Sequence, residues 1–365
     1  MKGAIKVGTQ RLSSIETKRF IFEPLSAFLE ARDISLANRT VINDIAVIAI
    51  LGTRSIGKTT LLKQLYDTAP DVSEYLDLSV SIRDSKFEEY FAACKASGKT
   101  RILLDEVCKI DKEYEADFVK AVKDYVPHMT FIITGSTQAV VSALSAKICR
   151  GIDVELVPIM YAESLSWSLG SSVVNPDSEV SNSTISLFEE YLRKGGIVTE
   201  SLAVQPLSFS EEQLELQFKN LVLCRLNACY SYIDKYRTPN QLGEIGSPGD
   251  ELDALYTVRS LSSSRVCGVE SKWRPRESIS NIRIAGYVKL ANRLGLDELA
   301  LTSTTVKAEE FTTGKLDVPT KIYRCDLLVL GLEAEYMRLV KRNLSGRECI
   351  GSSKSVSEIM EELLG

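Results

Sequence analysis

The sequence LGTRSIGKTTLLKQL, residues 51–65, has the spacing G-x-x-x-x-G-K-T of a phosphate-binding loop. The apolar run Ile45–Leu51 before it predicts a buried strand, and the residues after it predict a helix. Glycines let such a loop curl so that its N–H groups face phosphates at the positive end of the helix. We therefore expect ATP here, held by Gly52, Thr53, Arg54, Ser55, Ile56, Gly57, Lys58, Thr59 and Thr60.

A second motif, RILLDEV at residues 101–107, ends an apolar strand on two acids. We expect Asp105 to hold Mg²⁺ together with the Thr59 hydroxyl, because Mg²⁺ prefers oxygen ligands. Glu106 would then act as the base that polarises the attacking water, and Lys58 would place its charge on the phosphates. The acid pair favours hydrolysis over a kinase reaction. The alternative is a strand that ends on two solvated acids.

Two further candidates for the catalytic site follow the second motif. In FIITGST, residues 131–137, Thr134 or Ser136 would sense the γ-phosphate, unless Ser136 or Thr137 merely caps the next helix. Arg150 precedes the last predicted strand, where it is either a surface arginine that caps the preceding helix or, as the family resemblance given below implies, an arginine finger acting in cis or on a neighbouring subunit. The predicted catalytic residues are thus Glu106, Lys58, Arg150 and Ser136. The sequence has no Asn/Thr-Lys-x-Asp segment for guanine, which favours ATP.

Apolar and polar segments alternate along the chain in a way that predicts an α/β fold. The expected strands are Ile45–Leu51, Tyr75–Val80, Ile102–Asp105, Thr130–Thr134 and Val154–Val157. The expected helices are Glu16–Glu30, Lys58–Tyr66, Lys86–Ala96 and Glu113–Tyr125. Polar breaks then predict an N-terminal helical segment (1–41), a parallel-sheet ATPase core (42–170), a helical lid (171–250) and a C-terminal domain (251–365).

The C-terminal domain has the pattern of a winged-helix-like α+β domain. Ser278–Leu294 predicts a helix, and Leu299–Thr302 and Lys321–Leu330 predict two extended segments after it. Residues 256–354 hold 17 Lys and Arg against 11 Asp and Glu, in a chain of net charge −5. A DNA backbone would therefore be a candidate partner for Arg259, Arg265, Lys272, Arg274 and Arg276. The alternative is a solvated face around a core tryptophan.

Composition excludes several classes of protein. Of the 365 residues, 44% are hydrophobic and 25% are charged, which argues against disorder. Ile45–Leu51 is the longest apolar run, so no membrane span is expected, and the N-terminus has no signal-peptide core. We expect a soluble, cytoplasmic protein. A single histidine makes a His-rich metal site or a Ser-His-Asp triad implausible.

Together the segments GTRSIGKTT, ILLDEV, TGST, ELVPIMYAESLSW and YLRKGGIVTE resemble the prokaryotic AAA+/STAND-related P-loop ATPases of the archaeal-ATPase group over residues 42–205. In that group a proline and an acidic-aromatic segment follow the sensor strand, where this chain has Pro158, Tyr161 and Glu163. The resemblance implies an ASCE-type sheet, ATP with Mg²⁺, a helical lid and often a winged helix. Some relatives carry a nuclease-like E-x-K strand, which we do not expect in this chain.

Three functions fit these observations. The leading one is an ATP-hydrolysing AAA+/STAND-like protein that couples nucleotide state to DNA or to a protein partner. The resemblance places such proteins in mobile-element and defence processes, and a neighbouring subunit often completes their site. The others are a low-turnover signalling scaffold with a protein partner, and an ATP-liganded winged-helix regulator that binds DNA.

Overall fold

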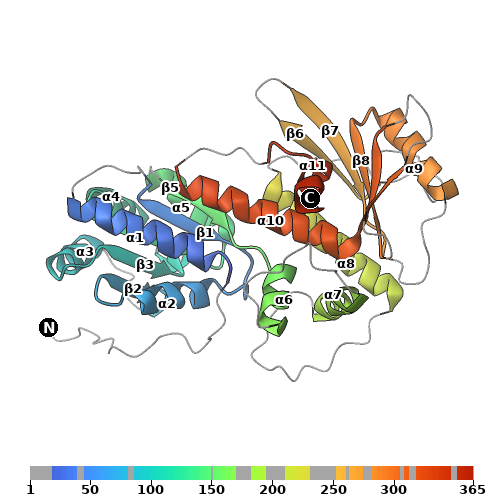
Figure 1. The fold of residues 1–365 in the computed structure, drawn as a ribbon. Coiled ribbons are helices and arrows are strands. Elements are labelled where there is room, and N and C mark those ends of the chain that lie inside the picture. The colour runs from blue at the N-terminus through green and yellow to red at the C-terminus, as the bar shows by residue number, and fades with distance from the viewer. Residues whose placement is uncertain are drawn as a thin grey trace. The chain divides into compact units, whose positions relative to one another are not determined.

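The computed structural model describes residues 19–38, 45–80, 86–148, 151–169, 182–194, 210–230, 252–259, 263–273, 281–304, 308–311, 318–346 and 352–364. These residues form two compact units (Figure 1). Unit 1 comprises Met1–Leu156 and Val340–Glu348, and unit 2 comprises Val157–Leu339 and Cys349–Gly365. Each unit has its own five-stranded sheet.

Unit 1 contains the predicted parallel sheet. Its strands are β1 (Val47–Leu51), β2 (Ser73–Asp77), β3 (Arg101–Asp105), β4 (Thr130–Thr134) and β5 (Gly151–Glu155). They lie in the order β2-β3-β4-β1-β5, and every neighbouring pair is parallel. Strand β4 thus separates the phosphate-loop strand β1 from the acidic strand β3. This order confirms the predicted α/β P-loop sheet.

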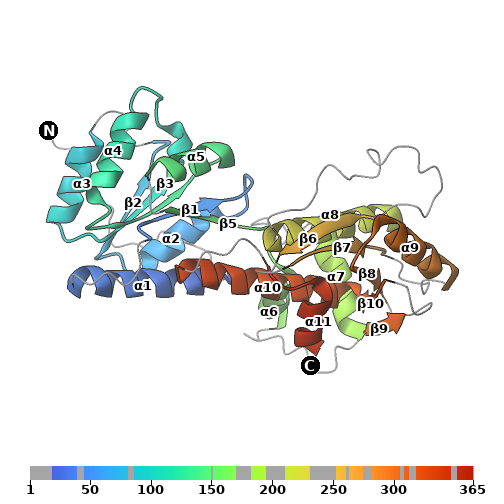
Figure 2. The ribbon, with the colours of Figure 1, turned by 90° about the horizontal axis from the view of Figure 1, so that it is seen from above.

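Helices cover both faces of this sheet, with α3, α4 and α5 on one face and α1 and α2 on the other (Figure 2). Their bounds are α1 (Phe22–Asn38), α2 (Lys58–Thr68), α3 (Phe87–Ala96), α4 (Glu115–Tyr125) and α5 (Gln138–Ile148), and a 3-10 turn, η1 (Val107–Lys109), follows β3. On the first face, Phe91 packs edge-on against Phe131 of β4, and Phe87 packs edge-on against Phe118. Because both faces are covered, the three central strands β1, β3 and β4 are buried along nearly their whole length and largely apolar.

The first helix differs from its predicted position. The sequence predicts Glu16–Glu30, whereas α1 begins at Phe22 and continues to Asn38. Its polar end is tied to the sheet, since Asp33 accepts hydrogen bonds from the Arg101 side chain (2.7 Å) and from the Thr100 hydroxyl (2.8 Å). The buried Arg101 explains why the helix continues past the predicted end.

Unit 2 contains a mixed sheet in place of the predicted winged helix. Its strands are β6 (Ala254–Arg259), β7 (Ser264–Glu270), β8 (Glu298–Ser303), β9 (Ala308–Phe311) and β10 (Thr320–Arg324). They lie in the order β6-β7-β8-β10-β9. The outer pairs β6–β7 and β10–β9 are antiparallel, and the inner pairs β7–β8 and β8–β10 are parallel.

This topology shows that the winged-helix prediction is wrong. A wing is an antiparallel hairpin after the helix, but β8 and β10 pair in parallel. The predicted strand Lys321–Leu330 is also wrong beyond Arg324, because the long helix α10 (Cys325–Leu344) begins at the next residue. The predicted helix Ser278–Leu294 is described as α9 (Asn281–Leu294).

The remaining helices of unit 2 are α6 (Tyr161–Leu169), α7 (Asn182–Lys194), α8 (Glu211–Cys229) and α11 (Val356–Leu364). Helix α8 starts at a capping box, in which Ser210 and Gln213 exchange side-chain-to-backbone hydrogen bonds. Helix α9 packs Ile284, Val288 and Ala291 into one hydrophobic core with apolar residues of β6, β8 and β10.

A buried ion pair joins three helices of unit 2. Arg225 of α8 donates from Nε to Glu333 Oε1 of α10 at 2.9 Å, and their side chains are 0% and 1% exposed. The Glu333 carboxylate also accepts the backbone N–H groups of Tyr161 and Ala162, at 2.8 and 2.9 Å, and so caps the start of α6. The start of α6 lies in the stretch from Pro158 to Glu163, on which the family resemblance partly rests.

Candidate nucleotide-binding site

The phosphate loop of unit 1 connects β1 to α2 and needs its glycines. Gly52 has φ 150° and Gly57 has φ 98°, and Ser55 between them also has positive φ, 64°. A Cβ atom on Gly52 would lie 2.8 Å from the Leu156 carbonyl oxygen, so no side chain fits there. The loop can therefore curl as the motif predicts, and α2 begins at Lys58.

Lys58 is buried inside this loop. Its ammonium donates to the carbonyl oxygens of Gly52 (2.7 Å) and Thr53 (2.8 Å). Burial lowers the pKa of Lys58, while the nearby charges of Glu106 and Asp105 act to raise it. Phosphate oxygens in the loop would compete with the two carbonyls for this ammonium.

Asp105 and Thr59 lie together, as the sequence predicts. Asp105 at the end of β3 is 2% exposed and hydrogen-bonds with the Thr59 hydroxyl. Tyr75 donates its hydroxyl to Asp105 Oδ2 at 3.1 Å, and the Glu106 N–H donates to Oδ1 at 3.0 Å. Burial raises the pKa of Asp105, against the effect of these hydrogen bonds. A hydroxyl and a carboxylate in contact fit a Mg²⁺ ion that keeps several waters.

Glu106 stands beside this pair in a left-handed conformation, φ 55° and ψ 43°, which is unusual for a residue other than glycine. Its Oε2 accepts the backbone N–H of Ser136 at 3.1 Å and the Cys108 thiol at 3.2 Å. Burial acts to raise the pKa of Glu106, but these hydrogen bonds outweigh it and the pKa is lowered. The carboxylate is therefore ionised at neutral pH, as a base requires.

Of the two sensor candidates, the structure brings Ser136 to the site. Its N–H contacts Glu106, and its hydroxyl lies 3.1 Å from the Cys108 sulfur. Thr134 is fully buried and donates to the Ile50 carbonyl at 3.1 Å, which ties β4 to β1. The other polar loop residues Arg54 and Ser55 are exposed, and Arg150 lies outside the described residues.

Three residues near the site were not predicted: Arg19, Tyr75 and Cys108. Arg19 precedes α1 and donates to the Ile56 carbonyl of the phosphate loop at 3.0 Å. No motif links residue 19 to the loop, since the contact depends on the packing of α1. Tyr75 could have been suspected from strand alternation, because a side chain two residues before the end of β2 lies beside β3.

Two of the predicted DNA-binding residues pair with acids of unit 2. Arg265 pairs with Glu358 at 2.7 Å. Lys272 pairs with Glu270 at 3.1 Å and with Glu215 at 3.2 Å. Arg259 is exposed at the end of β6. The other two candidates, Arg274 and Arg276, lie outside the described residues.

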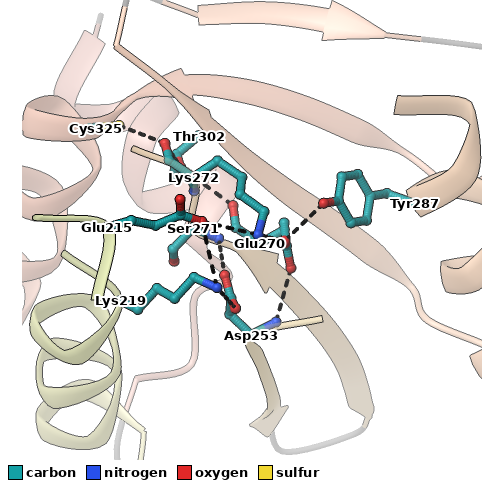
Figure 3. A network of polar contacts seen from close by, with 9 residues as sticks. All are labelled: Glu215, Lys219, Asp253, Glu270, Ser271, Lys272, Tyr287, Thr302 and Cys325. Atoms are coloured by element: carbon teal, nitrogen blue, oxygen red, sulfur yellow. Dashed lines mark hydrogen bonds and ion pairs between the residues drawn. The ribbon is translucent and has the colours of Figure 1, made fainter. Parts of the chain in front are cut away.

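Lys272 belongs to a network of carboxylates and lysines in unit 2 (Figure 3). Lys219 of α8 pairs with Asp253 at 2.9 Å, beside the Lys272–Glu270 and Lys272–Glu215 pairs. Glu270 is 2% exposed, and its carboxylate also accepts the backbone N–H of Asp253 at 3.1 Å. Burial raises the pKa of Glu270, and the adjacent Asp253 charge adds to this effect.

This network corrects one expectation from the sequence. Glu270-Ser271-Lys272, at the end of β7, is an E-x-K segment, although no such strand was expected. Asp253 accepts the Ser271 N–H at 2.7 Å, and the Tyr287 hydroxyl donates to Glu270 at 3.0 Å. Within the described ranges no group of three or more His, Cys, Asp or Glu residues is placed to hold a metal ion.

Comparisons with known proteins agree with the fold of unit 1. Its sheet order and phosphate loop define a P-loop NTPase, and residues 44–165 match the model of a family described as AAA domain. Over this third of the chain the sequence is therefore similar to AAA domains. No curated protein matches the chain.

Solved structures of AAA-type proteins are similar to part of the chain. A mutant of RuvB from Thermotoga maritima is 19% identical with TM-score 0.30, over 56% of this chain and 62% of that one. A structure on katanin self-assembly is 12% identical with TM-score 0.33, over 57% and 80%. PCH-2 of C. elegans is 13% identical with TM-score 0.33, over 55% and 60%. The matches thus span about three fifths of the RuvB and PCH-2 chains.

Among the described residues, no helix combines the length and the hydropathy that a membrane span needs.

Proposed function

We propose that this chain binds and hydrolyses ATP with Mg²⁺ at the end of the unit 1 sheet. The loop N–H groups and Lys58 bind the phosphates, and Thr59 and Asp105 would hold the metal. Mg²⁺, when bound, supplies charge neutralisation on the β- and γ-phosphates. Glu106 accepts a proton from the attacking water, and Ser136 fixes the Glu106 carboxylate.

The observation that carries this proposal is the meeting of three strand ends. Lys58 follows β1, Glu106 follows β3 and Ser136 follows β4, and the charges of Lys58 and Glu106 act on each other. A loop that only bound nucleotide would need no ionised base. The pair Asp105–Glu106 therefore favours a protein that hydrolyses ATP over a signalling scaffold that binds ATP and rarely hydrolyses it.

The test is ATP turnover by the full chain and by Glu106→Gln, with nucleotide binding measured in both. We expect the variant to bind ATP and to lose at least about 100-fold in kcat, the range of general-base catalysis. Lys58→Ala, the matched loop variant, should lose binding. Equal turnover by the full chain and Glu106→Gln would refute hydrolysis at this site.

We also propose that nucleotide state is coupled to a partner, as in the archaeal-ATPase group that the sequence resembles. The partner is a protein, DNA or a second copy that supplies or receives Arg150 as an arginine finger. The same turnover assay with duplex DNA at low salt tests the DNA arm, because phosphate contacts are salt-sensitive. Stimulation that salt removes would support DNA, and turnover that ignores DNA would leave a protein partner.

A second candidate function is metal-dependent phosphodiester cleavage in unit 2, and the E-x-K segment favours it. Asp253 and Glu270 lie side by side, and Lys272 lies 3.1 Å from Glu270 (Figure 3). One or two carboxylates plus a substrate phosphate are how Mg²⁺ is commonly bound, and the lysine would stabilise charge on the phosphate. Binding of the cation would displace Lys219 from Asp253.

Plasmid nicking in Mg²⁺ or Mn²⁺ tests this second candidate. Glu270→Gln and Lys272→Met should each abolish nicking, while Glu358→Gln, which breaks the Arg265 pair outside the network, should not. Because Glu270 is buried, circular dichroism must show that each variant is folded. Absence of nicking by the folded full chain would refute the candidate without affecting ATP hydrolysis.

A further inference from the structure

A thiol contacts the proposed base of the ATPase site. Cys108 Sγ donates to Glu106 Oε2, the oxygen that also accepts the Ser136 N–H. The contact depends on the left-handed backbone of Glu106, after which η1 turns the side chain of residue 108 back toward residue 106. Two donors on Oε2 fix the carboxylate in one rotamer and leave Oε1 with the greater proton affinity.

The structure leaves room for this thiol at the neighbouring strand. A Cβ atom on Gly135 would lie 3.1 Å from Cys108 Sγ and 3.4 Å from the Cys108 nitrogen. The sulfur also lies 3.1 Å from the Ser136 hydroxyl. Cys108 thus bridges the ends of β3 and β4, and a side chain at position 135 would crowd it.

We propose that Cys108 is a positioning residue for Glu106, an inference that rests on the proposed ATP hydrolysis. The thiol holds the carboxylate in its rotamer, because Glu106 Oε2 accepts both the Cys108 thiol and the Ser136 N–H, at 3.2 and 3.1 Å.

The experiment compares two replacements of the thiol. Cys108→Ala removes the donor, and Cys108→Ser keeps one on a similar side chain. We expect Cys108→Ala to lower kcat about tenfold, with the KM for ATP changed less than about twofold, because only the base has lost its support. Cys108→Ser should retain kcat within about threefold, because its hydroxyl can replace the thiol as donor.

Cys94→Ala is the matched control, since it removes a buried thiol from α3 in the same unit. It should lower the unfolding midpoint and leave kcat and KM unchanged. A wild-type kcat in Cys108→Ala would overturn the proposal. A raised KM with unchanged kcat would overturn it too, because that result indicates a binding role.

Crystal structures of the full chain and of Cys108→Ala separate this inference from the proposed function. If the full chain hydrolyses no ATP, the proposed function fails, yet the Glu106 rotamer still tests the inference. We expect the carboxylate to leave Ser136 in Cys108→Ala. An unchanged rotamer would overturn the positioning role.

Discussion

Replacing Glu333 by glutamine is expected to cost unit 2 about 3–5 kcal/mol of unfolding free energy, the range for breaking a buried ion pair. The two side chains have nearly the same shape, so the change removes charge and leaves packing intact. Arg225, which is 0% exposed, would keep its own charge without a carboxylate. A buried guanidinium cannot escape the cost by losing its proton.

The magnitude follows from the hydrogen bonds that glutamine cannot make. Three N–H groups, from Arg225, Tyr161 and Ala162, converge on the two carboxylate oxygens. Glutamine offers one carbonyl oxygen, so at least one donor faces an NH₂ group, at about 1–3 kcal/mol for each unsatisfied donor. The uncompensated charge accounts for the remainder. Arg225 retains the Pro158 and Ile159 carbonyls, which limits the loss.

The assay is urea unfolding followed by circular dichroism, with the midpoint and the slope both measured. Glu189→Gln is the control, because it breaks a Glu–Arg pair with Arg193 whose side chains are 36% and 25% exposed. That loss should be about 0.3–0.5 kcal/mol. A difference of less than about 1 kcal/mol between the two variants would refute the reasoning from burial. Replacing both Arg225 and Glu333 by leucine should restore much of the loss.

Three further predictions concern backbone strain, a half-buried pair and pH. Gly52→Ala should lower ATP affinity by at least about tenfold in a calorimetric titration, because its Cβ would meet the Leu156 carbonyl at 2.8 Å. Asp33→Ala should lower the unfolding free energy of unit 1 by about 2–3 kcal/mol in urea, because Arg101 is 4% exposed and loses its carboxylate. Burial acts to raise the pKa of Glu335, but hydrogen bonds lower it overall, so the folded state binds fewer protons than the unfolded chain near the ordinary carboxyl pKa. Its stabilisation is therefore present at neutral pH and lost as the pH falls through the lowered pKa, and Glu335→Gln should flatten the dependence of Tm on pH below about 5.

The sheet of unit 1 was predictable because its central strands are buried on both faces. Two of them, Val47–Leu51 and Arg101–Asp105, are short, mainly apolar runs with turn residues after them. This pattern is typical of strands in a parallel sheet that is covered on both faces. The phosphate-loop residues and the two acids could be named as candidates because a phosphate loop and a strand that ends on acids are local sequence patterns. The contact between Cys108 and Glu106 could not be predicted, because it depends on the left-handed backbone conformation of Glu106, which no sequence pattern indicates.

Unit 2 was harder to predict for two physical reasons. The apolar stretch after Arg324 is a helix buried on most sides, and periodicity cannot distinguish such a helix from a strand. Strand β7 and the residues after it carry basic side chains, which suggested a nucleic-acid surface. These side chains also obscured the alternation of apolar and polar residues that would have indicated a strand. Arg265 instead pairs with Glu358, and Lys272 with Glu215 as well as with Glu270; Glu358 and Glu215 come from distant parts of the sequence.

Helix α10 is divided between the units, so unit 1 is completed by a segment that comes late in the chain. Unit 1 includes residues 340–348, which the ribosome adds only after residues 157–339 of unit 2. Leu344 lines a groove with Phe28 of α1, so a part of unit 1 stays uncovered until late in synthesis. The N-terminal unit therefore cannot finish folding first, as a leading domain usually does. A fragment that ended at residue 165, where the AAA match stops, would expose α1 along this groove.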